Sequence, residues 1–382
     1  MKIAILTTDA REPLKDYKCP APYFGTAPEA LLQGFDALGG QVEVHVVSCF
    51  QKPAVFPEKI ADNIWYHGLL VPKIGWMRTL YQGCVRAVRN ALREIRPDIV
   101  HGQGTERDCA ISAVYSGFPN VLTIHGNMKA IAKFYRASPG SFHWLAAKLE
   151  TLALKRTAGV FCNSAYTESL VRPRARRVWR VPNPLRQSFL APPAKAQPVA
   201  PPIFLNVGAL EPRKRQSEIL AVARNLRQRG FRFEIQFAGQ AETATGYGAN
   251  FMRQLAEAQK NGYARHRGML NTVELIALMD EASALVHFPG EEAFGLVVAE
   301  ALARNLKLFA AATGGIVEIA QDADGAETLS AGDWNGLENA IARWLEAGCP
   351  RPKGAAQIMR ARYAPEVIAR RHLEIYREVL AL

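Results

Sequence analysis

Apolar residues in the first half of the chain form short runs that alternate with stretches of helical periodicity. Short runs rich in β-branched residues predict strands, and apolar residues three and four positions apart predict helices. The expected strands are residues 2–8, 42–49, 98–103, 120–125, 159–163 and 178–182, and the expected helices begin near Ala27, Arg78, Thr105, Phe142 and Ala165. This alternation favours βαβ units in a mainly parallel sheet.

A proline-rich segment, residues 191–202, separates this half from a second one. Its prolines exclude a helix and favour an extended, stiff connection. The alternation then restarts, with strands expected at 203–207, 233–238, 284–288 and 308–311 and helices at 216–229, 249–260, 272–281, 296–304 and 334–347. We therefore expect two α/β domains, residues 1–190 and 203–364, followed by a terminal helix at 365–382. Ligands favour the cleft that two such domains form.

The length of 382 residues allows two domains that each bury a core. A hydrophobic content of 49% with 21% charged residues is ordinary for a soluble globular protein. No apolar run reaches the roughly 18 residues that a spanning helix needs. The chain runs from Met1 straight into an expected strand without the pattern of a signal peptide, so we expect a cytoplasmic protein.

The six cysteines are scattered, and none has the spacing of a Cys-x-x-Cys pair or of metal ligands. Several have apolar neighbours, which indicates reduced thiols in the core. The cysteines therefore give no indication of a metal site.

The formal net charge of +12 indicates an anionic partner, which is a nucleotide, a nucleic acid or an anionic lipid. Arginines gather in two clusters, which are Arg78, Arg86, Arg89, Arg93 and Arg96, and then Arg172, Arg174, Arg176, Arg177 and Arg180. A solvated helix face and a surface loop explain them equally well. The sharper interpretation is a surface that docks on an anionic membrane leaflet.

Two glutamates, Glu292 and Glu300, flank the start of an expected helix that follows an expected strand. Glu292 falls in the loop and Glu300 on the helix, while Phe294, Gly295 and Leu296 fall at the helix start. Free N–H groups and the helix dipole attract a phosphate there, at the edge where open α/β sheets bind ligands. Solvated glutamates also arise at this spacing by chance. The functional alternative is a diphosphate held between two carboxylates that bind sugar hydroxyls.

Residues 207–215, Val-Gly-Ala-Leu-Glu-Pro-Arg-Lys-Arg, form a second candidate phosphate site after an expected strand. Gly208 permits a tight turn, from which Arg213 and Lys214 can reach anionic oxygens. A solvated basic loop is the alternative.

Two glycine-containing loops are less specific. Gly314-Gly315 follows a strand and is either a simple turn or a place of close backbone access to a ligand. Gly25 precedes Thr26, which with Glu29 three residues later predicts a capping box. Capping alone explains this loop well, and ligand binding is the weaker alternative.

His125 ends an expected strand and precedes Gly126. It is either a hydrogen-bonded structural group or an imidazole that bonds a sugar hydroxyl or a leaving phosphate. Other sites are unsupported, because the chain has no Gly-x-Gly-x-x-Gly after the first strand, no phosphate loop of the Gly-x-x-x-x-Gly-Lys-Ser/Thr type and no Gly-x-Ser-x-Gly elbow.

Taken together, these residues resemble the retaining glycosyltransferases of the GT-B fold, in the large group called glycosyl transferases group 1. The resemblance covers nearly the whole chain, and its most specific part is the Glu-x7-Glu segment from Glu292 to Glu300. The supporting segments, in chain order, are the Gly25 loop, His125-Gly126, Val181-Pro182-Asn183-Pro184, Lys214 and Gly314-Gly315-Ile316-Val317-Glu318.

The resemblance implies an α/β protein with two Rossmann-like domains facing a deep interdomain cleft, and a terminal helix that returns to the first domain. The first domain would be the acceptor side, and the second would hold a nucleoside-diphosphate sugar. Lys214, with Arg213, would bind the diphosphate, assisted by Gly208 and by the backbone N–H groups of Phe294, Gly295 and Leu296.

The remaining donor contacts are also assigned by the resemblance. Glu300 would bond the ribose hydroxyls, Glu292 the donor sugar, and Leu270 would lie near the base. Gly25 and Thr26 would approach the phosphates once the cleft closes. With His125 from the first domain, Lys214 and Glu292 are the expected catalytic residues.

Members of the family need no metal or other cofactor, because cationic side chains and helix N-termini stabilise the leaving group. They retain the anomeric configuration. No residue here is an evident covalent nucleophile, so the expected mechanism is a same-face displacement in which the departing phosphate accepts the acceptor's proton.

Four residues depart from the family's usual pattern. Thr26 replaces a frequent Gly, Gly290 a frequent Ser and Asn305 a frequent Gly, which Asn can replace because it accepts left-handed backbone angles. Ala209 stands where many relatives have Arg, so one phosphate contact is missing and Arg213 is the expected substitute.

We therefore expect a hexosyltransferase that moves a sugar from a nucleoside diphosphate to a sugar, lipid or small-molecule acceptor in glycan or glycolipid synthesis, with peripheral contact to an anionic membrane. A sugar-nucleotide epimerase on the same fold is the first alternative. The second is a non-catalytic nucleic-acid-binding protein that uses the cluster at 172–180. Aromatic residues for base stacking are sparse there, so no nucleic-acid partner is expected.

Overall fold

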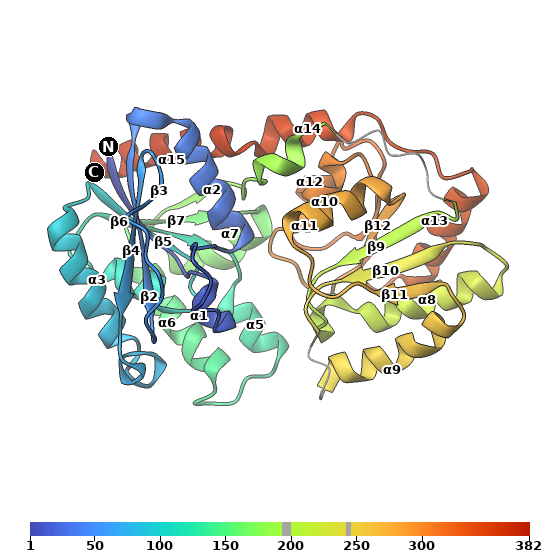
Figure 1. Cartoon of the computed structure of the whole chain (residues 1–382), viewed down its shortest axis with the longest axis horizontal. Helices are drawn as coiled ribbons and strands as arrows, with labels where there is room; N and C mark the ends of the chain where they lie inside the picture. Colours follow the sequence, from blue (N-terminus) through green and yellow to red (C-terminus); the bar gives the residue numbers. More distant parts are fainter. Residues whose placement is uncertain (193–199, 242–245) are drawn as a thin grey trace. The chain divides into compact units, whose positions relative to one another are not determined.

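The computed structural model describes residues 1–192, 200–241 and 246–382. The chain divides into two compact units, of which unit 1 is Met1–Gln187 with Tyr363–Leu382 and unit 2 is Ser188–Arg362 (Figure 1). Each unit has a mainly parallel sheet covered by helices, which confirms the expected α/β class. Within the proline-rich segment, residues 193–199 lie outside the described residues.

Unit 1 contains a sheet in the strand order β3-β4-β2-β1-β5-β6-β7-β8, parallel except for the antiparallel pair β3–β4. Its strands are β1 (Lys2–Leu6), β2 (Glu43–Phe50), β3 (Lys59–Ala61), β4 (Ile64–Leu70), β5 (Ile99–Gln103), β6 (Asn120–Ile124), β7 (Gly159–Cys162) and β8 (Val178–Arg180). Its helices are α1 (Arg11–Leu14), α2 (Thr26–Ala37), α3 (Gln82–Ile95), α4 (Asp108–Val114), α5 (Met128–Phe134), α6 (Phe142–Arg156), α7 (Ala165–Val171) and α15 (Pro365–Leu380).

The sheet of unit 1 is buried on both faces. Helices α3, α4 and α6 share one core with it, and α2 and α15 share the other. The approach of α15 to α2 is close, because a Cβ on Gly34 would lie 2.2 Å from the carbonyl oxygen of Pro365. The terminal helix is therefore part of the unit formed by the first half of the chain.

Unit 2 contains a fully parallel sheet in the order β11-β10-β9-β12-β13-β14. Its strands are β9 (Ile203–Val207), β10 (Glu234–Ala238), β11 (Ala264–His266), β12 (Ala284–His287), β13 (Lys307–Ala311) and β14 (Ala326–Leu329). Its helices are α8 (Gln216–Gln228), α9 (Gly246–Lys260), α10 (Thr272–Glu281), α11 (Leu296–Ala303), α12 (Ile316–Ala320) and α13 (Trp334–Glu346), and α14 (Ala355–Tyr363) ends at the border between the units.

The predicted capping box at the start of α2 is wrong. The helix begins one residue earlier than expected, with Gly25 as the N-cap and Thr26 as the first helical residue. The carbonyl of Gly25 already accepts a hydrogen bond from the backbone N–H of Glu29 at 3.0 Å. Glu29 is therefore four residues from the cap instead of three, and no side chain caps this helix.

The helix expected near Arg78 also begins later, at Gln82, because Leu80 and Tyr81 adopt left-handed angles that interrupt it. Asn305 has the predicted left-handed conformation, with φ of 54°. The six cysteines are free thiols, and four of them are buried, as predicted. Within the described ranges, no helix has the length and hydropathy that a membrane crossing requires.

Candidate functional site

Two loops of unit 2 meet at the carboxyl ends of the neighbouring strands β9 and β12. One loop contains Lys214, at the end of a 3-10 turn, and the other contains Glu292. The Lys214 Nζ atom lies 2.5 Å from the Glu292 Oε2 atom, and both side chains are largely buried. The structure thus pairs two of the predicted catalytic residues.

His287, the last residue of β12, completes this cluster. Its Nε2 atom lies 3.1 Å from the same Glu292 oxygen. Burial lowers the pKa of His287, so the imidazole is neutral and donates its Nε2–H to the carboxylate. Burial alone would raise the pKa of Glu292, but Lys214 and His287 outweigh it and hold that pKa far below its usual range. Glu292 is therefore an ionised acceptor for hydrogen bonds.

Arg213 connects the two loops. Its guanidinium donates to the carbonyl of Glu291 at 3.0 Å and to the carboxylate of Glu211 at 2.6 Å, and its own carbonyl accepts from the N–H of Gly290 at 2.8 Å. The charge of Arg213 is thus already compensated by protein carboxylates in this structure. Its expected role as a substitute at Ala209 stays a prediction.

Gly290, one of the departures from the family's pattern, is explained by Arg215. A Cβ at position 290 would lie 3.0 Å from the Nε atom of Arg215, so a serine here would press on that guanidinium. The Arg215 Cζ atom also lies 5.9 Å from the ring centroid of Trp334, within cation–π distance. The glycine therefore leaves room for an arginine that borders the same loop.

Gly314 and Gly315 pack against the Glu292 loop. A Cβ on Gly314, whose φ is +54°, would lie 1.6 Å from the carbonyl oxygen of Glu292, and a Cβ on Gly315 would lie 2.7 Å from the Cα of Phe294. The N–H of Gly315 also lies 3.4 Å from the Glu292 carbonyl oxygen. The sequence suggested that the backbone of these two glycines could approach a ligand closely. In this structure their backbone instead approaches the loop that carries Glu292.

Helix α11 begins directly after this loop, with Gly295 as its N-cap at φ +99°. Leu296 is its first residue, Phe294 is buried beside it, and a helix leaves its first N–H groups without an intrahelical partner. Glu300 lies on the second turn and is buried at 4% exposure. The predicted helix start therefore exists and adjoins Glu292, and its role in phosphate binding stays a prediction.

The other residues of unit 2 that are predicted to contact the sugar donor, Gly208 and Leu270, lie on neighbouring loops. Gly208 follows β9 with φ of +151°, and the carbonyl oxygen of Gly208 would lie 2.1 Å from a Cβ on Gly239. Leu270 lies between β11 and α10 and is half-buried. All these loops follow carboxyl ends of parallel strands, which is the edge that binds ligands in this class.

Gly25, Thr26 and His125 belong to unit 1. Gly25 is exposed at the start of α2, and His125 follows β6. The His125 Nε2 atom lies 2.9 Å from the Gln103 Oε1 atom. An amide oxygen only accepts, so Nε2 carries the proton and Nδ1 carries a lone pair.

A buried network holds this arrangement. The amide nitrogen of Gln103 faces the ring of His101, which contacts the Tyr376 hydroxyl at 2.5 Å and the Thr123 hydroxyl at 2.7 Å. Among the residues that the structure describes, none forms a hydrogen bond of good geometry with the His125 Nδ1 atom, although the nearby Asn183 side chain raises the pKa of this histidine against the larger effect of burial. Burial lowers the pKa of His125 to about 4, so its ring is neutral. An unprotonated Nδ1 atom can accept a hydrogen bond from a hydroxyl group but cannot donate one to a phosphate.

Solved structures with similar folds are glycosyltransferases. Sucrose-phosphate synthase from Thermosynechococcus elongatus has a TM-score of 0.77 and 19% identity, covering 100% of this chain and 99% of that one. HepE from Anabaena in complex with UDP-glucose has a TM-score of 0.69 and 15% identity, covering 99% and 100%. The lipopolysaccharide outer core galactosyltransferase WaaB has a TM-score of 0.68 and 14% identity, covering 99% and 100%. At this identity the similarity shows the fold.

Two family models match the sequence on either side of the proline-rich segment. Residues 29–187 match Glycosyltransferase Family 4, and residues 191–362 match Glycosyl transferases group 1. The chain belongs to the group 1 glycosyltransferases of the GT-B fold. A search of curated protein sequences finds no significant match.

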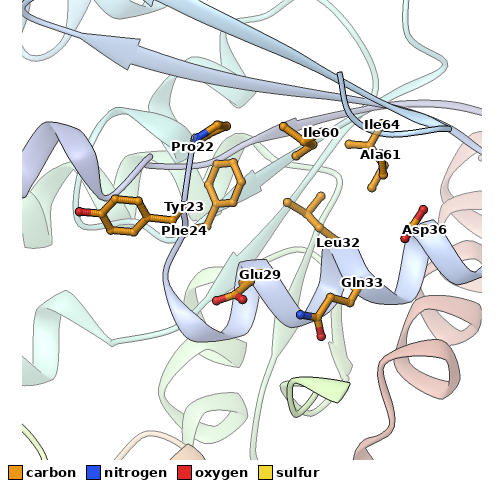
Figure 2. A pocket seen from close by; sticks show the side chains of 10 residues that line it. All are labelled: Pro22, Tyr23, Phe24, Glu29, Leu32, Gln33, Asp36, Ile60, Ala61 and Ile64. Atoms are coloured by element: carbon orange, nitrogen blue, oxygen red, sulfur yellow. The ribbon is translucent and has the colours of Figure 1, made fainter. Parts of the chain in front are cut away.

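The glycosyltransferase also has a pocket of about 210 Å³ within unit 1, between α2 and the β3–β4 hairpin. Figure 2 shows Glu29, Gln33 and Asp36 in sequence along α2, with Ile60, Ala61 and Ile64 from the hairpin. Burial raises the pKa of Glu29, although Arg186 lies 3.9 Å away. The lining mixes the polar side chains of α2 with apolar side chains of the hairpin, and none of the lining residues is a predicted contact of the sugar donor.

The second arginine cluster of the glycosyltransferase is largely paired with carboxylates. Arg172 and Arg180 both contact Glu168, and Arg174 contacts the buried Glu150 at 2.7 Å. These pairs reduce the free positive charge that an anionic surface would meet. The cluster is therefore a weak candidate for nucleic-acid or membrane binding.

The glycosyltransferase is expected to lose stability as the pH falls from about 6.5 toward 4. Burial lowers the pKa of both His125 and His372 to about 4, whereas an unfolded histidine titrates near pH 6.5. In this window the unfolded chain binds more protons, so acid favours unfolding. Circular dichroism melts across this range test the slope.

Two variants isolate the cause of that slope. His372→Phe should make the slope shallower, because one of the buried histidines whose pKa is lowered no longer contributes. His143→Phe, at a partly exposed position in the same unit, is the matched control for the replacement of a histidine by phenylalanine. Equal slopes in the wild type and in His372→Phe would contradict this account.

Proposed function

We propose that this glycosyltransferase moves a hexosyl group from a nucleoside-diphosphate sugar to an acceptor and retains the configuration of the anomeric carbon. The observation that carries the proposal is the Lys214–Glu292 pair, which lies beside the N-terminus of α11 at the ligand-binding edge of the unit 2 sheet. An ammonium group and a helix N-terminus favour a diphosphate, and an ionised buried carboxylate favours sugar hydroxyls.

In the proposed complex, Lys214 exchanges its carboxylate partner for the diphosphate oxygens. Glu292, whose carboxylate is then released from Lys214, accepts hydrogen bonds from the donor sugar while His287 keeps it oriented. Glu300 would accept the ribose hydroxyls, and the first N–H groups of α11 would bind phosphate oxygens. The protein thereby supplies positive charge where the leaving diphosphate becomes more negative.

The proposed reaction is a same-face displacement. The bond between the anomeric carbon and the diphosphate oxygen breaks, and that oxygen takes the proton of the acceptor hydroxyl as the new glycosidic bond forms. Positive charge from Lys214 and the α11 dipole supports departure, so we propose that no metal is needed. His125, which can only accept through Nδ1, would position a sugar hydroxyl.

The printed titles of similar structures give the first donors to test, since HepE was solved with UDP, with UDP and glucose, and with UDP-glucose. Uridine and guanosine diphosphates should be screened by thermal shift, because a ligand that binds the folded state raises the melting temperature. The matching UDP- or GDP-hexoses are then assayed for hydrolysis and for transfer, with and without EDTA.

The expected result is stabilisation by one nucleotide, turnover that survives EDTA, and a product with the donor's anomeric configuration by NMR. Inverted product would overturn retention, and loss of turnover with EDTA would overturn metal independence. If neither nucleotide stabilises the protein and no hexose is transferred, the donor assignment is wrong. An epimerised donor sugar in the absence of any acceptor would favour the epimerase.

The Gln103–His125 contact gives a prediction for the proposed role of His125. Gln103→Glu places a carboxylate against Nε2 and is expected to raise the pKa of His125 by about 1–3 units. A protonated imidazole no longer accepts a hydroxyl, so kcat/KM should fall at mildly acidic pH and recover at alkaline pH. The matched control is Gln82→Glu, at an exposed position on α3. An unchanged pH profile would remove His125 from the mechanism.

A further inference from the structure

Two segments of unit 1 contain no acidic residue, although the chain has 35 of them. These segments are residues 63–93 and 109–149, and both contain lysines and arginines. The exposed cations that lie soon after β4 and β6 are Lys73, Arg78, Lys129, Lys133 and Arg136. Positive charge there is thus not offset by carboxylates of the same segments.

The same two segments expose large apolar side chains. Leu70, Ile74 and Leu80 are 49%, 72% and 44% exposed, and Phe134, Tyr135 and Phe142 are 42%, 39% and 48% exposed. Among the described residues, these three are the exposed aromatic side chains of the protein. Apolar groups of this size normally pack inside, and a group of them between cations indicates an interaction surface.

Both groups lie at one edge of the unit 1 sheet. Leu70 ends β4 and residues 71–80 follow it, while residues 128–142 follow β6. These two strands are parallel members of the same sheet, with β2, β1 and β5 between them. The helices that continue from them, α3 and α6, share one core on one face of that sheet. In Figure 1, α5 and the turn into α6 lie at the lower edge of unit 1. We call residues 70–80 and 128–142 the apolar–basic edge.

We propose that the apolar–basic edge docks on the anionic surface of a lipid bilayer. Aromatic side chains with lysine and arginine around them suit the boundary between headgroups and acyl chains, and the cations suit anionic headgroups. Nucleic acid would also attract the cations and stack on the aromatics. The aliphatic chains of Leu70, Ile74 and Leu80 have no role in base stacking, whereas they insert into the acyl boundary.

This docking surface shares only Arg78 with the two arginine clusters of the sequence. In the second cluster, Arg172, Arg174 and Arg180 are paired with glutamates. The docking surface also differs from the pocket and from every predicted donor contact. The inference does not depend on the proposed reaction, since vesicle binding is measured without any sugar donor.

The test is co-sedimentation of the full-length protein with vesicles. Wild-type protein is mixed with phosphatidylcholine vesicles that contain or lack phosphatidylglycerol, at low and at high salt. Two triple variants each remove one property of the edge. The apolar triple is Ile74→Ser/Phe134→Ser/Phe142→Ser, and the cationic triple is Lys73→Gln/Lys133→Gln/Arg136→Gln. The matched controls are Val273→Ser/Val367→Ser/Leu382→Ser and Arg172→Gln/Arg176→Gln/Arg177→Gln, whose sites are also exposed.

Wild-type protein should bind the phosphatidylglycerol vesicles, and high salt should weaken that binding. Loss of three cations at the edge should reduce vesicle partitioning by about 10²-fold, and the apolar triple should reduce it by at least about tenfold. Both control triples should bind nearly as the wild type, with unchanged circular dichroism for every variant.

Three outcomes would overturn the proposal. The first is wild-type protein that does not bind anionic vesicles. The second is a control triple that reduces binding as much as its partner at the edge. The third is an edge triple that loses binding to single-stranded RNA while its vesicle binding is unchanged, which assigns the surface to nucleic acid.

Discussion

Lys214→Met is expected to lower kcat for sugar transfer by about 10²–10³-fold, because one positive group would be missing where the leaving diphosphate gains charge. Methionine keeps much of the length and flexibility of the lysine stem, so packing changes little. Steady-state kinetics on the donor found by the nucleotide screen measures the effect. The binding of the nucleotide alone should weaken less than kcat falls, since the charge develops in the transition state.

The Lys214–Glu292 pair gives this variant a second expected effect. Lys214 is the strongest influence that keeps Glu292 ionised against the effect of burial. In Lys214→Met the pKa of Glu292 should therefore rise toward its usual range, and residual activity should decline in mild acid where wild-type activity does not. The pH profile separates this effect from a simple loss of donor affinity.

Lys307→Met is the matched control for this variant. Lys307 also lies in unit 2 and also pairs with a glutamate, Glu327, at 2.9 Å, but it stands at the start of β13 and away from the loops that carry the site. Its replacement removes the same charge from the protein. If both variants lose activity equally, the effect is one of net charge or stability, and the assignment of Lys214 fails.

The regular part of the fold was predictable because its strands are buried on both faces. Strand β9 and helix α10 begin and end at the residues that the pattern predicts. The strand is an almost continuous buried run, and the buried leucines of the helix are three positions apart. Strands β3, β4, β11 and β14 were missed. They lie at sheet edges or next to them and have half-exposed positions, so their apolar pattern is weak.

The candidate site was predictable where a local pattern carries it. A strand followed by a loop and a helix start located Glu292 and Gly295 without any tertiary information. His287 was missed because it ends an apolar strand and looks like part of the core. The pairing of Lys214 with Glu292 joins residues 78 positions apart, and only the adjacency of β9 and β12 brings them together.

The contact between Arg215 and Gly290 is a second example of a packing relation that the sequence alone did not predict. Sequence comparison with the family's pattern presents Gly290 as an isolated loss of a serine. In the structure the space beside it is occupied by Arg215, which adopts a left-handed conformation at the start of α8. A departure from a pattern can thus depend on a spatial neighbour far away in the sequence, which the chain order does not reveal.

Gly314→Ala is expected to reduce activity by about 10²-fold or more while the protein stays folded. The new methyl group would lie 1.6 Å from the carbonyl oxygen of Glu292, so the loop that carries this carboxylate must move. A displacement of about 1 Å at a substrate-positioning group is enough for a loss of that size. Activity on the identified donor and the melting temperature should be measured together.

Gly262→Ala separates the clash from backbone strain. Gly262 also has a left-handed φ, +69°, but no atom lies within 4 Å of its added Cβ. Both variants should lose about 1–2 kcal/mol of stability from the unfavourable φ alone. Only Gly314→Ala should also lose activity, because only there does the methyl group meet the backbone of Glu292. Full activity in Gly314→Ala would show that the position of this loop does not control transfer.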